Sequence, residues 1–210
     1  MTEVLKPFVV GEGGSGAGKT TAIDGLKNSE ELREWRFFRE PGGTVFGEAI
    51  RVAVQEHKDW EIDPMAALFG YSASRANLVN NEILPILEGK RVSKGVFLDR
   101  YWFATFAYQG SEKVDREIIV AVSKIATKGL MPNLVLHYDL LPEIAMARKA
   151  GCTDIDRYDM KELEFHRRVR DAYLELSVRF PDIWRVIDAS ASKEQVLADS
   201  IRALREFGLI

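Results

Sequence analysis

The residues that most clearly indicate chemistry form a glycine-rich stretch near the N-terminus. Residues 13–20 read GGSGAGKT and match the pattern G-x-x-x-x-G-K-[ST]. The stretch follows the apolar run Phe8–Val10 and precedes a segment with helical periodicity, which is the context that this pattern requires. Glycines let backbone N–H groups approach phosphate oxygens closely, and the N-terminus of a following helix favours negative charge. The sequence therefore predicts a loop that binds the phosphates of a nucleoside triphosphate.

Two side chains at the end of this loop would act on the nucleotide directly. Lys19 would carry a positive charge to the β- and γ-phosphates, and the Thr20 hydroxyl would be a ligand of Mg²⁺. Asp99 ends the apolar run Val96–Leu98, where a carboxylate can support the same metal ion. An apolar run ending in aspartate is common, so this assignment depends on the loop. The guanine-reading pattern N/T-K-x-D is incomplete at Thr127–Leu130, which argues against a GTPase.

Composition and charge exclude several other classes of protein. The chain has 210 residues, 46% of them hydrophobic, with 29 lysines and arginines against 32 aspartates and glutamates. This is the balance of a globular chain long enough to fill one core, so we expect a single domain over residues 1–210. A net charge of −3 argues against a nucleic-acid partner, and no apolar run has the length of a membrane span. The N-terminus does not resemble a secretory signal and Cys152 is the only cysteine, so we expect a cytoplasmic location.

The elements that must position these side chains follow from short apolar runs that alternate with amphipathic segments. The apolar runs predict strands at 8–10, 35–38, 96–98, 134–136 and 184–187. Helical periodicity predicts helices near 19–29, 47–57, 64–88, 114–127, 142–149, 160–179 and 193–206. Short, continuously apolar strands joined by helices are typical of a parallel sheet buried on both faces, in a three-layer α/β domain. The polar segment 149–157 is predicted as either a connector or a mobile lid.

Further segments are specific enough to point to one family. Residues 39–44 read REPGGT and residues 47–51 read GEAIR; DRY stands at 99–101 and AYQG at 107–110. Arg75 follows in the pattern S-A-S-R, Pro132–Leu134 opens a strand, and residues 156–159 read DRYD. In the same order, these resemble the REPGGT…GEKIR, DRY…AYQG, F-x-A-x-R, PDL and DRIE segments of bacterial-type thymidylate kinases. The resemblance extends from Phe8 to about Ile187.

The resemblance implies a P-loop NTPase fold with a five-stranded parallel sheet, and transfer of the γ-phosphate of Mg²⁺-bound ATP to dTMP, a step in nucleotide biosynthesis that gives dTDP. It also implies a homodimer formed by helix packing, to which the helical segment 64–88 would contribute. The acceptor phosphate would be largely dianionic at neutral pH, so no general base is needed. Catalysis would rest on positioning and on neutralisation of charge, which requires lysines and arginines from separate segments to converge.

The resemblance also implies roles for individual residues. Those placed on ATP are Gly13, Gly14, Ser15, Gly16, Ala17, Gly18, Lys19, Thr20, Thr21 and Arg148. Those placed on the acceptor are Ser15, Glu40, Pro41, Arg51, Tyr71, Arg75, Arg100, Thr105, Tyr108 and Gln109. Arg51 would hold the monophosphate, Tyr71 and Arg75 would stack on and read the thymine, and Tyr108 would pack against the deoxyribose. The metal would be held by Thr20 and Asp99.

Catalysis would need cations close to the transferred phosphate. Besides Lys19, the resemblance places Arg100 between the donor and acceptor phosphates. One subgroup of the family carries arginine where this loop has Gly16, so here the remaining cation would come from the lid, about 149–158. Its candidates are Arg157 and Lys149.

Four positions depart from the family pattern. Ser15 stands where the family usually has a carboxylate that contacts the sugar 3′-hydroxyl, and Tyr71 replaces phenylalanine. Ala104-Thr105 replaces Ser followed by Ser or Asn, and Gly11 replaces phenylalanine. Ser15, Tyr71 and Thr105 belong to the predicted acceptor pocket, which leaves dUMP or a modified pyrimidine monophosphate open as the acceptor.

Two further readings are a kinase of another nucleoside monophosphate and a non-catalytic ATP-binding sensor. The first leaves the REPGGT and AYQG segments unexplained, and the second has no use for a bridging arginine. The three histidines show no spacing typical of a metal site and are predicted to be structural or surface residues: His57, His137 and His166.

Overall fold

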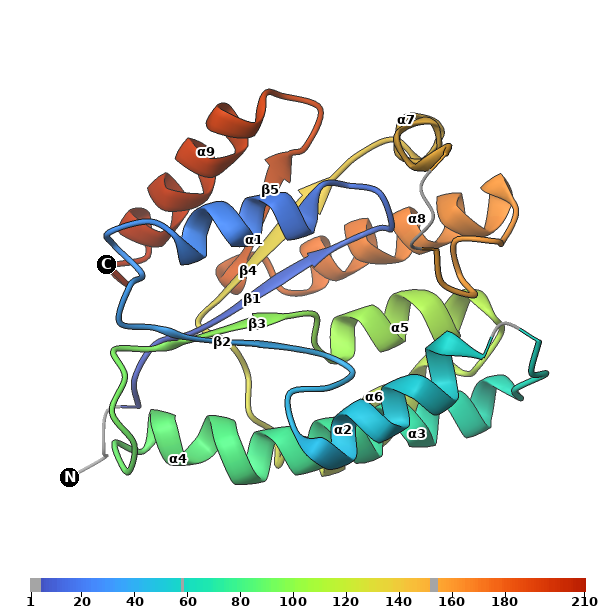
Figure 1. Cartoon of the computed structure of the whole chain (residues 1–210), viewed down its shortest axis with the longest axis horizontal. Coiled ribbons are helices and arrows are strands. Elements are labelled where there is room, and N and C mark those ends of the chain that lie inside the picture. The colour runs from blue at the N-terminus through green and yellow to red at the C-terminus, as the bar shows by residue number, and fades with distance from the viewer. Residues whose placement is uncertain (1–4, 58, 152–154) are drawn as a thin grey trace.

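A sheet of five parallel strands runs through the centre of the molecule (Figure 1), whose computed structural model describes residues 5–57, 59–151 and 155–210. The strand order is β2-β3-β1-β4-β5. Each predicted apolar run lies in one of these strands: β1 (Phe8–Gly13), β2 (Arg36–Arg39), β3 (Val96–Asp99), β4 (Leu134–Asp139) and β5 (Trp184–Asp188). The predicted five-stranded parallel α/β fold is therefore confirmed.

Helices cover both faces of the sheet. The α-helices are α1 (Lys19–Lys27), α2 (Val45–Arg51), α3 (Pro64–Leu78), α4 (Leu84–Leu87), α5 (Trp102–Ser111), α6 (Arg116–Ala126), α7 (Pro142–Lys149), α8 (Leu163–Arg179) and α9 (Lys193–Glu206). Two π-helical turns, Val52–Glu56 and Val79–Ile83, follow α2 and α3, and a 3₁₀ turn, Pro181–Ile183, precedes β5. Among the described residues, no helix combines the length and apolar character needed to cross a membrane.

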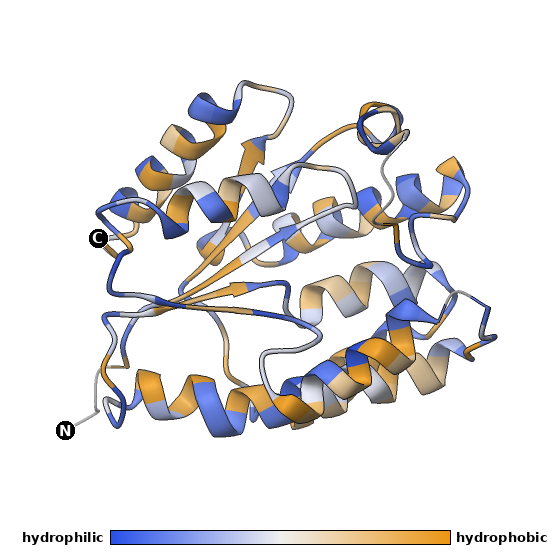
Figure 2. Cartoon of the chain, viewed as in Figure 1, coloured by the Kyte–Doolittle hydropathy of each residue, from blue (hydrophilic) through white to orange (hydrophobic). Residues whose placement is uncertain are grey.

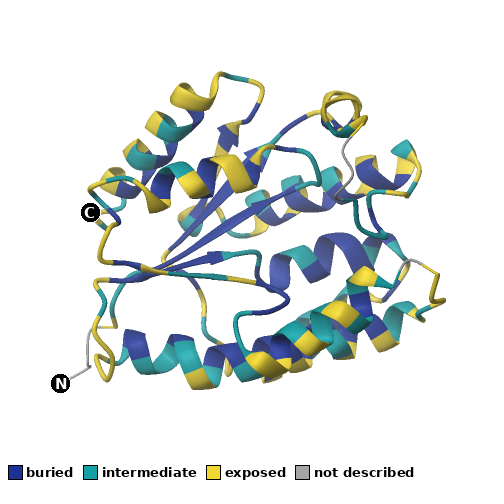
Figure 3. Cartoon of the chain, in the orientation of Figure 1, coloured by how far each residue is buried: buried dark blue, intermediate teal, exposed yellow. Residues whose placement is uncertain are grey.

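The two faces of the sheet bury separate hydrophobic cores because side chains alternate along a strand. In β1, Val9 packs into the core beneath α1 and α9, whereas Phe8 and Val10 pack into the larger core with α3, α5 and α8. Figure 2 shows the apolar strands at the centre, and Figure 3 shows that they are buried while the outer faces of the helices are exposed. The burial on both faces explains why the strands are almost continuously apolar.

Helix α5 is the one described α-helix of ten or more residues that the periodicity does not predict. Eight of its residues are buried, on most sides of the helix, because it lies between the sheet, α3, α6 and α8. A helix that is enclosed in this way has no polar face, so its sequence lacks the period that marks a surface helix. The predicted helix 64–88 is observed as α3 and α4 joined by a π-helical turn.

The parallel arrangement brings the ends of several strands to one edge of the sheet. In the register of β1 and β3, Gly11 pairs with Asp99, and in that of β1 and β4, Gly13 pairs with Tyr138. The predicted phosphate loop leaves β1 at this edge, and Arg100 follows β3 there. Ligands of open parallel sheets bind at such an edge, where neighbouring strands connect in opposite directions.

Candidate active site

The phosphate loop has a backbone that only glycine suits at two positions. Gly13 has φ +155° and Gly16 has φ +75°. A Cβ at Gly13 would lie 2.7 Å from the carbonyl oxygen of Tyr138, and one at Gly16 would lie 2.6 Å from that of Ala145 in α7. The loop is therefore pressed between β4 and α7, and its close packing excludes any larger side chain. Helix α1 begins directly after it, so the free N–H groups of the first turn face the loop.

The lysine and the aspartate predicted on either side of the phosphates meet in the structure. Lys19 is buried and forms an ion pair with Asp99 at the end of β3. Burial lowers the pKa of Lys19, and the Asp99 carboxylate opposes this shift. Thr20 and Thr21 follow in the first turn of α1, where both are exposed. The site therefore holds its donor-side cation against a carboxylate that phosphate oxygens can replace.

Arg100 is held beside the loop in a backbone conformation that arginine rarely adopts, with φ +70°. Its Nη1 donates to the carbonyl oxygen of Gly13 at 3.1 Å and to the Tyr173 hydroxyl at 3.4 Å. The guanidinium also lies over the Tyr108 ring, 5.2 Å from the ring centre. These contacts place the guanidinium between the phosphate loop and α5, as predicted for a bridging arginine.

Glu12 supports this arrangement and is absent from the predicted site. Its side chain is fully buried; Oε1 accepts from the Tyr101 N–H at 2.7 Å and Oε2 from the Tyr173 hydroxyl at 2.9 Å. Burial raises the pKa of Glu12 to about 7, although Arg100 and these hydrogen bonds oppose the shift. Glu12 thus fixes the backbone next to Arg100. An acidic residue within an apolar strand was the available signal in the sequence.

The loop after β2 is shaped by the REPGGT segment. The Gly42 N–H donates to the Ser74 hydroxyl of α3 at 3.2 Å, and a Cβ at Gly47 would lie 2.5 Å from the Gly42 carbonyl oxygen. Arg51, at the end of α2, donates to the Pro41 carbonyl oxygen at 3.3 Å. The segment therefore packs closely against α2 and α3, which positions Glu40 and Pro41 next to the sheet edge.

A buried charged pair lies at the inner end of the predicted acceptor site. Arg75 Nε donates to Glu40 Oε2 at 2.6 Å, and both side chains are 3% exposed. Arg75 Nη2 donates to the Thr105 hydroxyl at 3.0 Å. Burial raises the pKa of Glu40 to about 7, and Arg75 opposes the shift. Arg75 Nη1 and Glu40 Oε1 are buried without a hydrogen-bond partner among the described residues, so both can bind a polar ligand.

These side chains line a pocket of about 460 Å³ beside the phosphate loop. It contains nine of the ten predicted acceptor residues: Ser15, Glu40, Pro41, Tyr71, Arg75, Arg100, Thr105, Tyr108 and Gln109. Arg51, the tenth, does not line it and lies behind Pro41. Five further lining residues were not predicted: Gln55, Tyr101, Ala104, Asp156 and Tyr158. The sequence therefore identified most of a pocket that is assembled from five separate segments.

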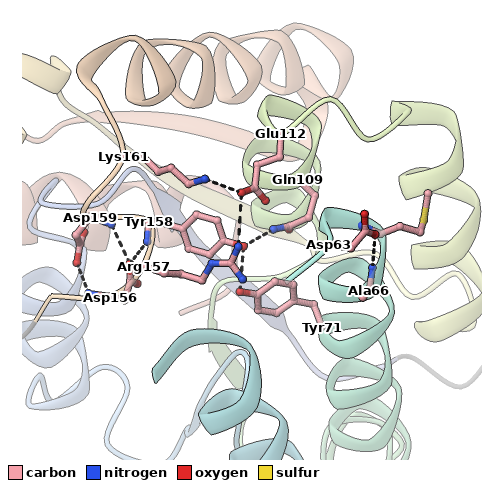
Figure 4. A network of polar contacts seen from close by, with 11 residues as sticks. Asp63, Ala66, Tyr71, Gln109, Glu112, Asp156, Arg157, Tyr158, Asp159 and Lys161 are labelled. Carbon is pink, nitrogen blue, oxygen red and sulfur yellow. Dashed lines mark hydrogen bonds and ion pairs between the residues drawn. The ribbon is translucent and has the colours of Figure 1, made fainter. Parts of the chain in front are cut away.

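Tyr158 is the most informative of the unpredicted residues. Its buried hydroxyl accepts from Gln109 Nε2 at 2.7 Å and from the Tyr71 hydroxyl at 3.3 Å (Figure 4). The Tyr158 ring packs edge-on against Tyr108 and is stacked with Phe165 of α8. The segment before α8 thus forms one wall of the acceptor pocket. The hydroxyl by which Tyr71 differs from the family's phenylalanine has its partner in Tyr158.

Helix α7 lies over the phosphate loop and carries two predicted cations. Arg148 donates to the Ala189 carbonyl oxygen at 3.0 Å and lies 3.9 Å from where a Cβ of Gly18 would be. Lys149 donates to the Ser15 hydroxyl at 3.1 Å. Both therefore reach the loop. Of the predicted lid, residues 152–154, which include Cys152, lie outside the described residues.

Arg157, the other predicted lid cation, has a different environment. Its Nη2 lies 3.9 Å from Glu112 Oε1 at the end of α5, and its guanidinium lies 5.3 Å from the Tyr158 ring centre. The three histidines are distributed as side chains in packing contacts: His137 lies between Tyr173 and Trp184, His166 beside Phe165, and His57 on Trp60. Within the described part of the chain, no group of three metal-binding side chains of the His, Cys, Asp or Glu type converges.

Comparisons with known proteins agree with this geometry. The family model described as Thymidylate kinase matches residues 12–200. The thymidylate kinase of Pelotomaculum thermopropionicum is 40% identical over 205 residues, covering 95% of this chain and 93% of that protein. That of Pediococcus pentosaceus is 35% identical over 203 residues, covering 94% and 96%. The crystal structure of thymidylate kinase from Ehrlichia chaffeensis superposes with a TM-score of 0.73 at 25% identity, over 94% of this chain and 98% of that one.

Proposed function

The chain belongs to the thymidylate kinase family, and from this premise we propose how its residues carry out the ATP-dependent phosphorylation of dTMP to dTDP. The observation that carries the proposal is the polar pocket beside the phosphate loop. Arg100 contacts both, and Arg75 and Glu40 supply an unpartnered donor and an unpartnered oxygen at the inner end of the pocket. A base bound there would direct its monophosphate toward the loop.

On the acceptor side, the polar edge of thymine would satisfy the groups that the protein leaves unpaired. Arg75 Nη1 would donate to a carbonyl oxygen of the base, while Thr105 and Glu40 keep the guanidinium in place. Tyr71 would cover the base and Tyr108 the deoxyribose, in keeping with their positions in the pocket wall. Arg51 would reach the monophosphate from behind Pro41.

On the donor side, Lys19 would exchange Asp99 for the β- and γ-phosphates of ATP. Asp99 and the Thr20 hydroxyl would then be available as oxygen ligands, which suits Mg²⁺ because this ion is usually held by one or two protein oxygens together with phosphates. Bound Mg²⁺ would neutralise phosphate charge and orient the γ-phosphate. Arg148 lies between Gly18 and Ala189, where it would cover the adenine of ATP.

Transfer would need positioning and charge neutralisation rather than a general base, because the acceptor phosphate is already anionic. Lys19 would bind the transferred phosphate from the loop and Arg100 from β3, with Lys149 or Arg157 as the third cation. Glu12 would act as a positioning residue, because it holds the backbone next to Arg100 rather than touching the nucleotides.

The departures from the family pattern do not favour another acceptor. The Ser15 hydroxyl is bonded to Lys149, the Tyr71 hydroxyl to Tyr158 and the Thr105 hydroxyl to Arg75, so each is satisfied within the protein. At Gly11 a Cβ would lie 3.1 Å from the Phe97 ring, so Phe97 fills the space of the usual side chain. The pocket therefore supports dTMP as the acceptor.

A kinetic panel tests this function. ADP release from ATP and Mg²⁺ would be measured with dTMP, dUMP, dCMP, dGMP and dAMP, and we expect dTMP to give the highest kcat/KM. A higher kcat/KM with another monophosphate would contradict dTMP as the acceptor. Tight ATP binding with no turnover on any monophosphate would identify a sensor instead.

The homodimer implied by the family has a suitable surface. Helix α3 contacts both α2 and α6, and large apolar side chains on the three helices are exposed: Phe46, Phe69, Ile118 and Ile125. We expect light scattering to give twice the mass of the 23.7 kDa chain and Phe69→Asp to give a monomer. We further propose that residues 1–210 form one domain and act in the cytoplasm, where ATP and nucleoside monophosphates are available.

A further inference from the structure

The segment between α7 and α8 offers few cations for the transferred phosphate. From Lys149 to Arg157 the sequence contains no other lysine or arginine, and Lys161 follows just before α8. The phosphate loop itself has Gly16 where a cation could have stood. One of these side chains must therefore complete the neutralisation of charge, and the structure distinguishes them by the direction in which each is held.

Lys149 is directed at the phosphate loop. Its Nζ donates to the Ser15 hydroxyl at 3.1 Å and forms an ion pair with Asp159, to which the Ser15 hydroxyl also donates. This position follows from helix packing: the Ala145 carbonyl lies against Gly16, and Lys149 is one helical turn further along the same face of α7. Lys149 is thus held by the closest contact between α7 and the loop.

Arg157 is directed at the opposite side, toward α5. Glu112, at the end of that helix, is almost buried and lies 3.9 Å from Arg157 Nη2 and 3.1 Å from Lys161 Nζ (Figure 4). The neighbouring Tyr158 hydroxyl accepts from Gln109 of the same helix. Arg157, Tyr158 and Lys161 therefore attach this segment to α5.

A tight turn separates the two directions. The Asp156 carboxylate accepts from the N–H groups of Tyr158 at 2.8 Å and Asp159 at 3.0 Å, and the Asp156 N–H donates to Asp159 Oδ2 at 2.8 Å. In Figure 4, Asp156 and Asp159 lie on one side of the turn, while Arg157 and Tyr158 extend toward Gln109 and Tyr71. The turn thus places Asp159 at the phosphate loop and Arg157 at α5.

We propose that Lys149 is the lid's catalytic cation, that Asp159 is the positioning residue that holds it at Ser15 before nucleotides bind, and that Arg157 anchors the segment to Glu112. This inference rests on the proposed function and decides between its two candidate cations. Although burial alone would raise the pKa of Asp159, its contacts with Lys149 and Ser15 lower it, so the carboxylate is ionised at neutral pH. Phosphates would take over the ammonium from this carboxylate, as they take over Lys19 from Asp99.

In the transfer step, an oxygen of the acceptor phosphate forms a bond to the γ-phosphorus while the bond from that phosphorus to the β–γ bridging oxygen breaks. The electron pair of the broken bond stays on ADP. The Lys149 ammonium keeps its proton throughout and stabilises the charge on the oxygens of the transferred group. No additional reactant is required.

Steady-state kinetics with dTMP and ATP test this division of roles. We expect Lys149→Met to lower kcat about 100-fold with both KM values within about threefold, and Lys149→Arg to restore at least about tenfold of the loss. Arg157→Met and Glu112→Gln should each lower kcat by less than about tenfold, and the double variant should be no worse than the weaker single one. Lys27→Met, on the exposed end of α1, is the matched control.

The opposite pattern would overturn the inference: a kcat loss of about 100-fold in Arg157→Met that Glu112→Gln does not share, with Lys149→Met nearly active. Failure of the proposed function is a separate result, because it would appear in the unmodified enzyme as a lack of turnover with dTMP.

A second measurement does not depend on turnover. Amine-selective acetylation, read by mass spectrometry, should modify Lys149 slowly in the unmodified protein and faster in Asp159→Asn, while Lys27 reacts equally in both. An adenosine–thymidine compound joined by five phosphates should protect Lys149 in both proteins. Lack of protection would show that Lys149 does not reach the phosphates and would contradict the proposal.

Discussion

The donor and acceptor halves of the site hold their charged groups in different ways. On the donor side, Lys19 is paired with Asp99 and Lys149 with Asp159, and each carboxylate occupies a position that phosphate oxygens can take. On the acceptor side, Arg75 is held by Glu40 and Thr105, and the two charged side chains of this set are 3% exposed. The donor side is therefore built for exchange of ionic partners, whereas the acceptor side is built before the ligand arrives.

This difference matches the tasks of the two halves. Phosphates are common to every nucleotide, so the donor side needs strong but exchangeable charge. A base is distinguished by the pattern of its polar edge, and a rigid set of buried donors and acceptors rejects a wrong pattern because its own groups would stay unpaired. Specificity is accordingly expected in the buried set around Arg75, and rate in the cations around the loop.

The largest effect is expected at the boundary between the halves. Arg100→Ala should lower kcat about 1000-fold, because it removes the guanidinium between the two phosphates, and should change the Kd for ATP by less than about threefold. Kinetics together with calorimetric titration of ATP would measure both quantities, with Arg33→Ala at an exposed site as the control. Equal losses in kcat and in ATP affinity would place Arg100 on the donor side alone.

The next effect separates the halves by stability. Arg75→Met should lower the free energy of unfolding by about 3–5 kcal/mol, because it leaves the buried Glu40 carboxylate unpaired. The double variant with Glu40→Gln should recover part of this loss. Lys149→Met, whose ion pair is nearer solvent, should cost less than about 1 kcal/mol. Urea unfolding measures all three, and equal costs for the two single variants would contradict the distinction.

The pH dependence of stability should also differ between the halves. The pKa of Glu40 is about 7 in the folded protein against 4.5 for the free side chain, so the folded state binds the proton more tightly. Its contribution is therefore greatest below pH 4.5 and decreases as the pH rises to 7, by about 3 kcal/mol. Asp159, whose pKa is lowered from 3.8, contributes no slope in this range and loses its contribution only in more acidic solution.

Urea unfolding at pH 5 and pH 8 tests this difference. Glu40→Gln should reduce the decline in stability between the two pH values, whereas Asp159→Asn should leave the decline unchanged. Glu12, whose pKa is also about 7, should contribute a similar decline, which Glu12→Gln removes. A decline that survives both glutamine variants would show that other groups cause it.

The smallest effect is expected where the acceptor wall is joined by neutral groups. Tyr71→Phe removes one hydrogen bond to Tyr158, so the free energy of unfolding should fall by about 0.5–1.5 kcal/mol. Tyr158→Phe removes the acceptor of Gln109 as well and should cost more. Measured kcat/KM values for dTMP and dUMP would show whether these hydroxyls affect the base. A reversal of preference in Tyr71→Phe would give Tyr71 a direct role in specificity.

Much of the donor side was predictable because its requirements are local. The loop needs glycines where its backbone has positive φ, a lysine at the start of α1, and a strand before it, and all of these are neighbours in the sequence. The strands were equally predictable, since burial on both faces leaves a continuous apolar run. The acceptor residues came from resemblance to a family, and nine of ten line one pocket.

What the sequence by itself determined is therefore the phosphate loop, the parallel α/β fold and most of the residues around the two substrates. Only the tertiary structure decided the strand order, the enclosed helix α5, and the parts played by Glu12 and Tyr158. It also gave Lys149 and Arg157 opposite directions, although both stand in one polar segment. The reason is physical: local backbone needs and periodic burial leave a pattern along the chain. A side chain's partner, by contrast, is set by packing between segments that are distant in sequence, as Tyr158 is from Tyr71.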